Sequence, residues 1–227
     1  MVQTIPLSWS ENSLSRQRSI EVPEATIFLR NYCKAPFVEA LKPDDGLRAF
    51  ARLPEREHQL LKKIAGLPES ILTLAYTRQG VIVGQVTLVP ADDFWRGLAN
   101  TYEIAFEVST GWRRRGLARQ LLKLVFELDC LDDLIIIGMG LSWHWDIEGL
   151  GLPPFAYRAM LARLSARYGF AEYLTSEPNI RMDPANIFLA RLGRRVSPAH
   201  ISQFYDRLLQ AEALPGMQVF PASLTSQ

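Results

Sequence analysis

The segment 101–108 alternates apolar and polar residues, which predicts a strand. From position 117 onward the apolar residues recur as on one face of a helix, at Leu117, Leu121, Leu124, Val125 and Leu128. The residues 109–118 between these two patterns carry three arginines and two glycines. The chain is therefore expected to run from a strand, through a basic turn, into an amphipathic helix.

Hydrophobic patterning elsewhere predicts the remaining elements. Strands are expected at 25–30, 71–76, 81–89, 134–140 and 170–175, with the second and third joined by Thr77–Gly80 as a hairpin. Helices are expected over 36–62 in two pieces, the second running from Pro54 to Gly66, and at 153–168, 183–193 and 198–213. Residues 1–22 are expected to be irregular, 23–213 to form one domain, and 214–227 to be a tail. This order predicts a mixed α/β layer fold.

Composition argues against several classes of protein. The 227 residues carry a formal net charge of +1, which provides no bulk attraction to nucleic acid. No apolar run is long enough to span a bilayer, and the first twenty residues lack the layout of a signal peptide. Cys33 and Cys130 make no disulfide framework, and no cluster has the spacing of metal ligands. A cytoplasmic protein is expected, with no metal and no membrane or nucleic-acid partner.

The turn 109–118 is a candidate anion site. The first N–H groups of a helix have no partners within the helix, and together with the helix dipole they favour negative charge. Arg113, Arg114 and Arg115 raise the local positive potential. The turn lacks the Gly-Lys-Ser/Thr ending of a P-loop and the three glycines of the dinucleotide fingerprint. A basic helix start exposed to solvent is the alternative interpretation.

The spacing Arg-x-x-Gly-x-Ala from Arg113 to Ala118 resembles the pyrophosphate-binding signature of the GNAT acetyltransferases. The resemblance implies the GNAT acyl-CoA N-acyltransferase fold, a mixed-sheet α/β fold, with acetyl-CoA as co-substrate. It also implies a set of cofactor-binding residues: Val108, Arg113, Arg114, Arg115, Gly116, Leu117, Ala118 and Asn186. Asn186 resembles the residue that opens a helix beside the pantetheine arm. Residues 141–180 exceed the minimal GNAT pattern and are expected to form an inserted helical segment.

Six further pieces between about 50 and 208 resemble the acetoin-utilisation acetyltransferases within GNAT. They are Lys63–Glu69, Ala105–Val108, Trp143–Asp146, Glu177-Pro178, Pro184–Asn186 and Ala190–Gly193. Trp-His-Trp-Asp is an uncommon tetrapeptide, which makes the combination specific. That family acetylates a lysine of acetyl-CoA synthetase, so the resemblance implies this enzyme as protein substrate. Acetylation would remove a charge that its active site uses and would inactivate it.

Acetyl transfer to lysine requires a neutral amine, although at pH 7 only about one lysine in 2,500 is deprotonated. A nearby carboxylate can take the proton. Glu103 and Glu107 share one face if the strand is regular, whereas a bulge would split their directions, and a solvated edge is the alternative. Glu107 occupies the family's Ala-x-Glu-Val position and resembles the catalytic base, with Glu103 in reserve. By analogy with GNAT enzymes, the Val108 N–H is expected to donate to the thioester carbonyl.

Trp143, His144, Trp145 and Asp146 are expected to bind the protein substrate, because they follow a predicted strand and would overlie the cleft. The alternative is a packed surface loop in which His144 is bonded to Asp146. Two other functions also remain open, namely acetylation of a small-molecule amine and a non-catalytic acyl-CoA sensor.

Other reactive side chains receive structural interpretations. His58 and His200 lie in predicted helices and are expected to be structural or solvated. The pair Arg194-Arg195 is expected at a solvated helix exit, with contact to the adenosine 3′-phosphate as the alternative. Cys33 and Cys130 have no activating partner in the sequence pattern and are expected to be inert thiols.

Overall fold

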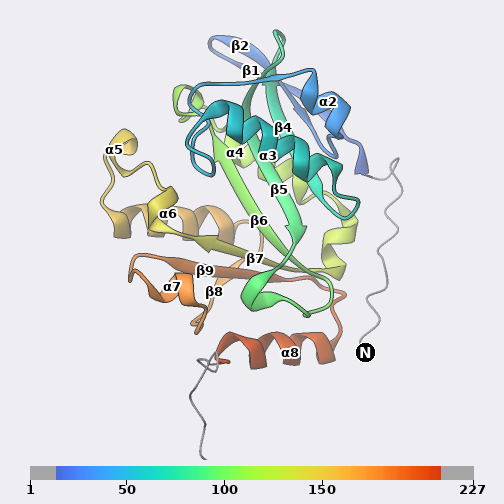
Figure 1. Cartoon of the computed structure of the whole chain (residues 1–227), viewed down its shortest axis with the longest axis vertical. Coiled ribbons are helices and arrows are strands. Elements are labelled where there is room, and N and C mark those ends of the chain that lie inside the picture. Colours follow the sequence, from blue (N-terminus) through green and yellow to red (C-terminus); the bar gives the residue numbers. More distant parts are fainter. Residues whose placement is uncertain (1–13, 211–227) are drawn as a thin grey trace, which may run out of the picture.

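The computed structural model of the chain describes residues 14–210 (Figure 1). Within these residues, nine strands form one sheet in the order β1-β2-β4-β5-β6-β7-β9-β8, with β3 paired to β5. The strands are β1 (Gln17–Val22), β2 (Ala25–Arg30), β3 (Lys42–Pro43), β4 (Ile71–Thr77), β5 (Val81–Pro90), β6 (Thr101–Val108), β7 (Ile135–Gly140), β8 (Ala171–Glu172) and β9 (Ile187–Leu192). Most neighbouring pairs are antiparallel, while β6 runs parallel to β7 and β3 to β5.

The helices lie on both faces of this sheet. They are α2 (Ala35–Glu39), α3 (Pro54–Gly66), α4 (Leu117–Val125), α5 (Ile147–Leu150), α6 (Pro154–Ala166), α7 (Pro178–Arg181) and α8 (Pro198–Leu208). Short 3-10 turns are η1 (Asp93–Trp95), η2 (Thr110–Trp112), η3 (Asp129–Asp133) and η4 (Ser142–His144). In Figure 1, α2 and α3 lie in front of the sheet and α4 behind it.

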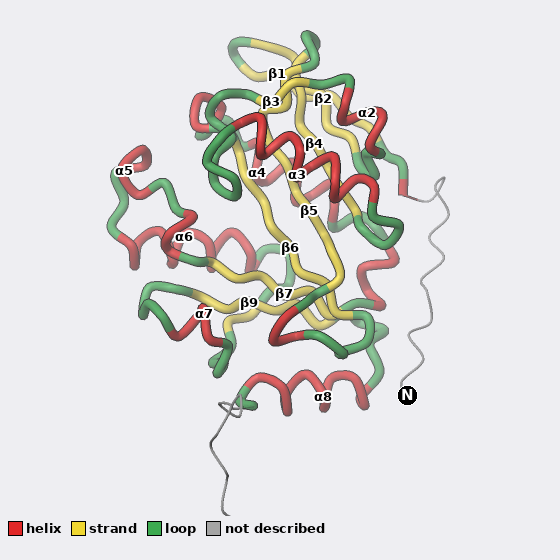
Figure 2. The backbone as a smooth tube through the Cα atoms, viewed as in Figure 1, coloured by secondary structure: helices red, strands yellow, loops and turns green. Residues whose placement is uncertain are grey.

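The two central strands separate along their length. β5 pairs with β6 over the whole stretch from Tyr102 to Val108, whereas the pairing of β6 with β7 covers only Thr101–Glu103. Beyond Glu103 the two strands diverge, which Figure 2 shows as a widening gap between β6 and β7. The sheet therefore has an open seam in its interior at the C-terminal half of β6.

Alternation along the strands divides the core between the two faces. Tyr102, Ile104 and Ile136 point to the face covered by α4, where Leu117, Leu121, Leu124 and Val125 are buried against them. On the opposite face, α2 and α3 cover the β4–β5 half, and Phe204 and Leu208 of α8 cover the β7–β9 half. Glu103 and Glu107 alternate with the first set, so both point to the face that carries α3 and α8.

Much of the predicted element order is confirmed, including the mixed α/β class. The hairpin is β4–β5, and its turn closes with a bond from Gly80 N to Thr77 O (3.0 Å). The strand–turn–helix pattern is β6, η2 and α4. The expected insertion near 141–180 contains η4, α5, α6, β8 and α7.

Four predictions need correction, and three of them concern the bounds of elements. Residues 17–22 are not irregular, because they pair antiparallel with β2 as β1; residues 1–13 lie outside the described part. The strand expected at 170–175 is limited to Ala171–Glu172. The closing helix ends at Leu208, and the predicted positions 211–213 and the tail at 214–227 also lie outside the described residues.

The helix expected at 183–193 is a turn followed by β9. Asp183 and Pro184 looked like a helix cap and a first helical residue, but the Asp183 carboxylate accepts from Ala185 N (2.8 Å). The backbone then closes a turn from Asn186 N to Asp183 O (2.9 Å). The next six residues are largely buried and pair with β7, so tertiary pairing overrides the local cap signal.

Candidate active site

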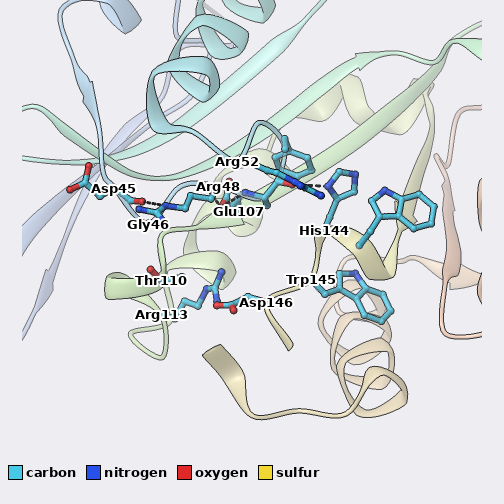
Figure 3. A pocket seen from close by; sticks show the side chains of 13 residues that line it. Asp45, Gly46, Arg48, Arg52, Glu107, Thr110, Arg113, His144, Trp145 and Asp146 are labelled. Atoms are coloured by element: carbon cyan, nitrogen blue, oxygen red, sulfur yellow. Dashed lines mark hydrogen bonds and ion pairs between the residues drawn. The ribbon is translucent and has the colours of Figure 1, made fainter. Parts of the chain in front are cut away.

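Two cavities meet at the open seam of the sheet. One, here called the groove, has a volume of about 540 Å³ and lies between β6 and β7, against α4 and α6. The other, here called the side cavity, has about 550 Å³ and lies between the β3–α3 loop (residues 44–53) and residues 143–146 (Figure 3). Six residues line both: Ala49, Phe50, Glu107, Arg113, His144 and Trp145.

The start of α4 forms one end of the groove. The helix begins at Leu117, directly after Gly116, whose φ of 78° lies in the left-handed region that favours glycine. No side chain of the described residues caps this helix start, and Arg114, Gly116, Leu117 and Ala118 line the groove. Its first amides and the helix dipole thus favour an anionic group at this end.

The three arginines of the turn have different environments. Arg114 lines the groove, whereas Arg115 is turned toward the β1–β2 turn, where its Nε lies 2.7 Å from the Glu24 carboxylate. That bond lowers the pKa of Glu24. Arg113 donates to the Val108 carbonyl (3.1 Å) and pairs with Asp146, so it joins the end of β6 to the segment 143–146. The three arginines therefore do not act as one set: Arg114 lines the groove, Arg115 is bound to Glu24, and Arg113 is paired with Asp146.

The Val108 N–H faces the seam. Ser109 N donates to Val83 O and Ala91 N to Thr101 O (2.9 Å each), so the odd-numbered residues of β6 exchange hydrogen bonds with β5. The even-numbered amides, including Val108, point the other way, where β7 has diverged. This orientation fits a donor to a carbonyl group bound in the groove.

Glu107 lies where the two cavities join (Figure 3). Its Oε1 accepts from the backbone amides of Arg48 (2.8 Å) and Ala49 (3.0 Å). Its Oε2 is buried and has no hydrogen-bond partner among the described residues. Burial raises the pKa of this carboxyl, while the two amide bonds act in the opposite direction. The group is thus held by two amides through one oxygen, while its other oxygen has no partner among the described residues.

Glu103 lies on the same face, because the β5–β6 register is regular between the two residues. Four residues of strand separate them by about 13 Å. Burial raises the pKa of Glu103 to about 7, with smaller contributions from Glu177 and Asp93. It lines the groove where β6 and β7 are still paired, at a distance from the side cavity.

The β3–α3 loop is tied to the turn after β6. Asp44 accepts from the Ser109 hydroxyl and from Trp112 Nε1 (3.2 Å). Gly46 lies against this contact, and a Cβ there would approach Ser109 Oγ to 2.3 Å, which explains a glycine. The loop is thereby held beside Glu107, to which it donates the amides of Arg48 and Ala49.

The segment 143–146 closes the other side of the junction. His144 Nδ1 lies 2.6 Å from Ala49 O, and because a carbonyl only accepts, Nδ1 carries a proton. This contact replaces the His144–Asp146 bond of the alternative interpretation. Trp145 stacks on Tyr157, with ring centroids 4.9 Å apart, and Asp146 caps α5 by accepting from Gly149 N (2.9 Å). Trp143 remains 45% exposed.

Asn186 occupies a structural position. It precedes a strand instead of opening a helix, and its side chain accepts from Ser142 N (2.7 Å) and donates to Asn179 O (2.8 Å). It is buried, and it joins η4 to the end of α7. It does not line the groove.

The remaining reactive groups lie away from the junction. Arg194 and Arg195 follow a strand and pair with Asp132, Asp129 and Asp133 of η3. His58 Nε2 contacts Val38 O (2.8 Å), and Ser197, not His200, supplies the cap of α8. Burial raises the pKa of Cys33 to about 12 and of Cys130 to about 11, which disfavours the thiolates.

Sequence reasoning missed several groups at the site. The β3–α3 loop contributes Arg48, Ala49, Phe50 and Arg52 to the side cavity, and no local motif announces them. Glu57, by contrast, carried a usable signal, because it precedes the buried Leu61 and Ala65 at intervals of four. A carboxyl at a core position of an amphipathic helix is unusual and indicates a specific partner.

Residues 14–210 contain no helix that is both long and apolar enough to cross a membrane. Over the same range, no three His, Cys, Asp or Glu side chains gather in the manner of metal ligands.

Comparison with known proteins yields consistent matches. The model of the acetyltransferase (GNAT) family matches residues 36–128. Acetoin utilization protein AcuA of Bacillus licheniformis is 36% identical over 169 residues, covering 72% of this chain and 79% of that protein. The protein of the same name from Bacillus subtilis is 34% identical over 168 residues, covering 71% and 78%. The crystal structure of an acetoin utilization protein from Exiguobacterium sibiricum superposes with a TM-score of 0.81 at 27% identity, covering 86% of this chain and 94% of the other.

Proposed function

The chain belongs to the GNAT family of acetyltransferases, and on that premise we propose that it transfers the acetyl group of acetyl-CoA to a lysine of acetyl-CoA synthetase. The observation that carries the proposal is the position of Glu107, which lines both cavities and keeps one oxygen without a partner among the described residues. A base at this point reaches an acceptor in the side cavity and a thioester in the groove.

The groove fits an acyl-CoA. Its anionic end would lie at the start of α4, near Arg114, Gly116 and Ala118, where amides and dipole favour phosphate. Acetyl-CoA supplies the activated acetyl group. The Val108 N–H faces the seam and would donate to the acetyl carbonyl as negative charge develops on its oxygen.

Glu107 would act as the general base. The Oε2 atom takes a proton from the lysine ammonium, and the amine then attacks the acetyl carbon directly, so that an N–C bond forms as the C–S bond breaks. The amides of Arg48 and Ala49 hold Oε1 and fix the direction of Oε2. Bringing an amine with a pKa near 10.4 to its neutral form at pH 7 requires roughly 4–5 kcal/mol, which the base and desolvation must supply.

A protein substrate is favoured by the side cavity and by the kinship with acetoin utilization proteins. The cavity contains Trp143, Phe50 and His144 and so offers aromatic and apolar walls to the stem and ammonium of a lysine side chain. The proposed reaction takes place in the cytoplasm. Acetylation would inactivate acetyl-CoA synthetase by removing a charge its chemistry uses.

Mass spectrometry of acetyl-CoA synthetase tests the proposal. Acetyl-CoA synthetase is incubated with acetyl-CoA and one of three proteins: the wild-type chain, Glu107→Gln, or Glu103→Gln. Glu103→Gln is the matched control. One new acetyl-lysine is expected with the wild type and the control, at a rate about 10²- to 10⁴-fold lower with Glu107→Gln.

The alternatives predict different results. Acetylation of a small amine, with none on the protein, would assign a small-molecule acetyltransferase. Binding of acetyl-CoA without transfer to either class of amine would assign a sensor, in which Glu107→Gln leaves the affinity unchanged.

A further inference from the structure

A second carboxyl group is buried behind Glu107. Glu57 lies in the first half of α3 and has no exposed surface. Its Oε2, like that of Glu107, is buried and has no hydrogen-bond partner among the described residues. An acid in the core reduces stability unless it is neutral or well bonded, so its presence at this position points to a specific role.

Gln85 connects the two acids. It is the direct cross-strand partner of Glu107 in the β5–β6 register, and its Nε2 donates to Glu57 Oε1 (2.5 Å). Its side-chain bonding lowers the pKa of both carboxyls. Gln85 therefore lies between the helix carboxyl, to which it donates, and the strand carboxyl, whose cross-strand neighbour it is.

The backbone of the β3–α3 loop acts on both acids. Arg48 N and Ala49 N donate to Glu107 (2.8 and 3.0 Å). The backbone amides of Phe50 and Ala51 lower the pKa of Glu57. The conformation of this loop, which forms a wall of the side cavity, thus depends on both acids together.

The two carboxyls do not ionise independently. Burial raises the pKa of Glu57 to about 7, and the negative charge of Glu107 adds to that effect. Glu57 accordingly keeps its proton at slightly acidic pH. Above pH 7 Glu57 ionises, and its charge then favours proton uptake by Glu107.

We propose that Glu57 is a positioning residue for Glu107: through Gln85 and the loop amides it holds the free oxygen of Glu107 at the junction of the cavities, and its negative charge makes Glu107 a stronger base. This inference rests on the proposed function, in which Glu107 accepts the proton of the lysine. Glu57 itself touches no substrate.

Other charged or titratable groups around the pair belong to several elements. They are Arg48, Arg52 and Asp45 of the loop, His58 on α3, Arg113 after β6, and His144 and Asp146 opposite. Arg113 lowers the pKa of Glu107, and it is already paired with Asp146. The effect of Glu57 on the pH dependence of kcat/KM is thus best isolated with variants that leave all these groups unchanged.

The test is the pH dependence of kcat/KM for Glu57→Gln, with Glu55→Gln as the control, an exposed acid on the same helix. Dividing the wild-type value by the variant value at each pH removes the ionisation of the lysine substrate. For Glu57→Gln this ratio is expected to rise roughly two- to fivefold between pH 6 and 8, with its inflection near 7. For Glu55→Gln it stays level.

Gln85→Met provides a second variant should Glu57→Gln fold poorly. It keeps both acids but removes the bond that lowers the pKa of Glu57. The inflection that Glu57 causes in the pH profile of kcat/KM should therefore lie at higher pH in Gln85→Met than in the wild type. A level ratio for Glu57→Gln, or an unmoved inflection in Gln85→Met, overturns the inference. If Glu107→Gln retains the wild-type rate, the proposed base fails instead, so the two failures are distinguishable.

Discussion

The two ends of β6 carry the same residue type on the same face, yet they differ in every property that matters for chemistry. At Glu103 the strand is paired on both sides, and the side chain is partly exposed. At Glu107 the neighbour β7 has diverged, two amides hold one oxygen, and the residue lines two cavities. A raised pKa is common to both groups, so perturbed acidity alone does not locate a base. The pairing of the strand, the two amide bonds and the position at both cavities separate them.

The sharpest way to break this comparison is to neutralise each acid in turn. Glu107→Gln keeps size and should lower kcat by about 10²- to 10⁴-fold, because the proton acceptor is lost. Glu103→Gln should change kcat less than about threefold. Both are measured as initial rates of acetyl-lysine formation at saturating acetyl-CoA. Equal losses in the two variants would contradict the distinction between the paired and the open end.

The paired end should respond in stability instead. The folded-state pKa of Glu103 is raised to about 7, so between about pH 4.5 and 7 the folded chain holds a proton that the unfolded chain has released. Stability contributed by this group is full at low pH, falls as pH rises through that window and is level above 7. The free energy of unfolding of Glu103→Gln, relative to that of the wild type, should therefore be about 1–2 kcal/mol higher at pH 8 than at pH 4.5, after allowance for partial exposure.

Thermal unfolding at the two pH values measures this effect. The Tm of Glu103→Gln relative to wild type should be about 3–6 °C higher at pH 8 than at pH 4.5. Equal Tm differences at both values would show that Glu103 titrates normally.

Loosening the open end should have a smaller effect on catalysis. His144→Ala removes the bond to the Ala49 carbonyl, and Ala49 N is one of the two amides that hold Glu107. We expect kcat to fall about tenfold, as one hydrogen bond to the loop is lost. His200→Ala, at the start of α8, serves as the control and should leave kcat unchanged. A rise in the lysine-substrate KM with constant kcat would instead assign His144 to substrate binding.

The smallest expected effect concerns the arginines beyond the open end. Arg114 lines the groove, whereas Arg115 is bound to Glu24. Arg114→Ala should weaken acetyl-CoA binding about threefold, the usual effect of one partly exposed charge, and Arg115→Ala should leave it unchanged. Titration calorimetry measures both values, and a larger loss for Arg115→Ala would reverse the assignment.

The local parts of this site could be predicted from the sequence, and its non-local parts could not. A strand, a turn and a helix that follow one another leave a continuous pattern, so β6 and α4 were predicted correctly. The Asp183-Pro184 turn imitated a helix start, because the same carboxylate–amide bond closes both structures. The amides of Arg48 and Ala49 reach Glu107 across nearly sixty residues of chain, and backbone donors carry no sequence signature.

The divergence of β6 and β7 places an unpaired strand edge inside the molecule instead of at its rim. Edges at the rim invite other chains to add a strand, which is a common route to aggregation. Here the even-numbered amides of β6 face a groove flanked by α4 and α6, so only a slender, extended chain can pair with them. The amides of β6 can thereby hydrogen-bond to a bound ligand in the groove, but they are not accessible to a strand of another protein.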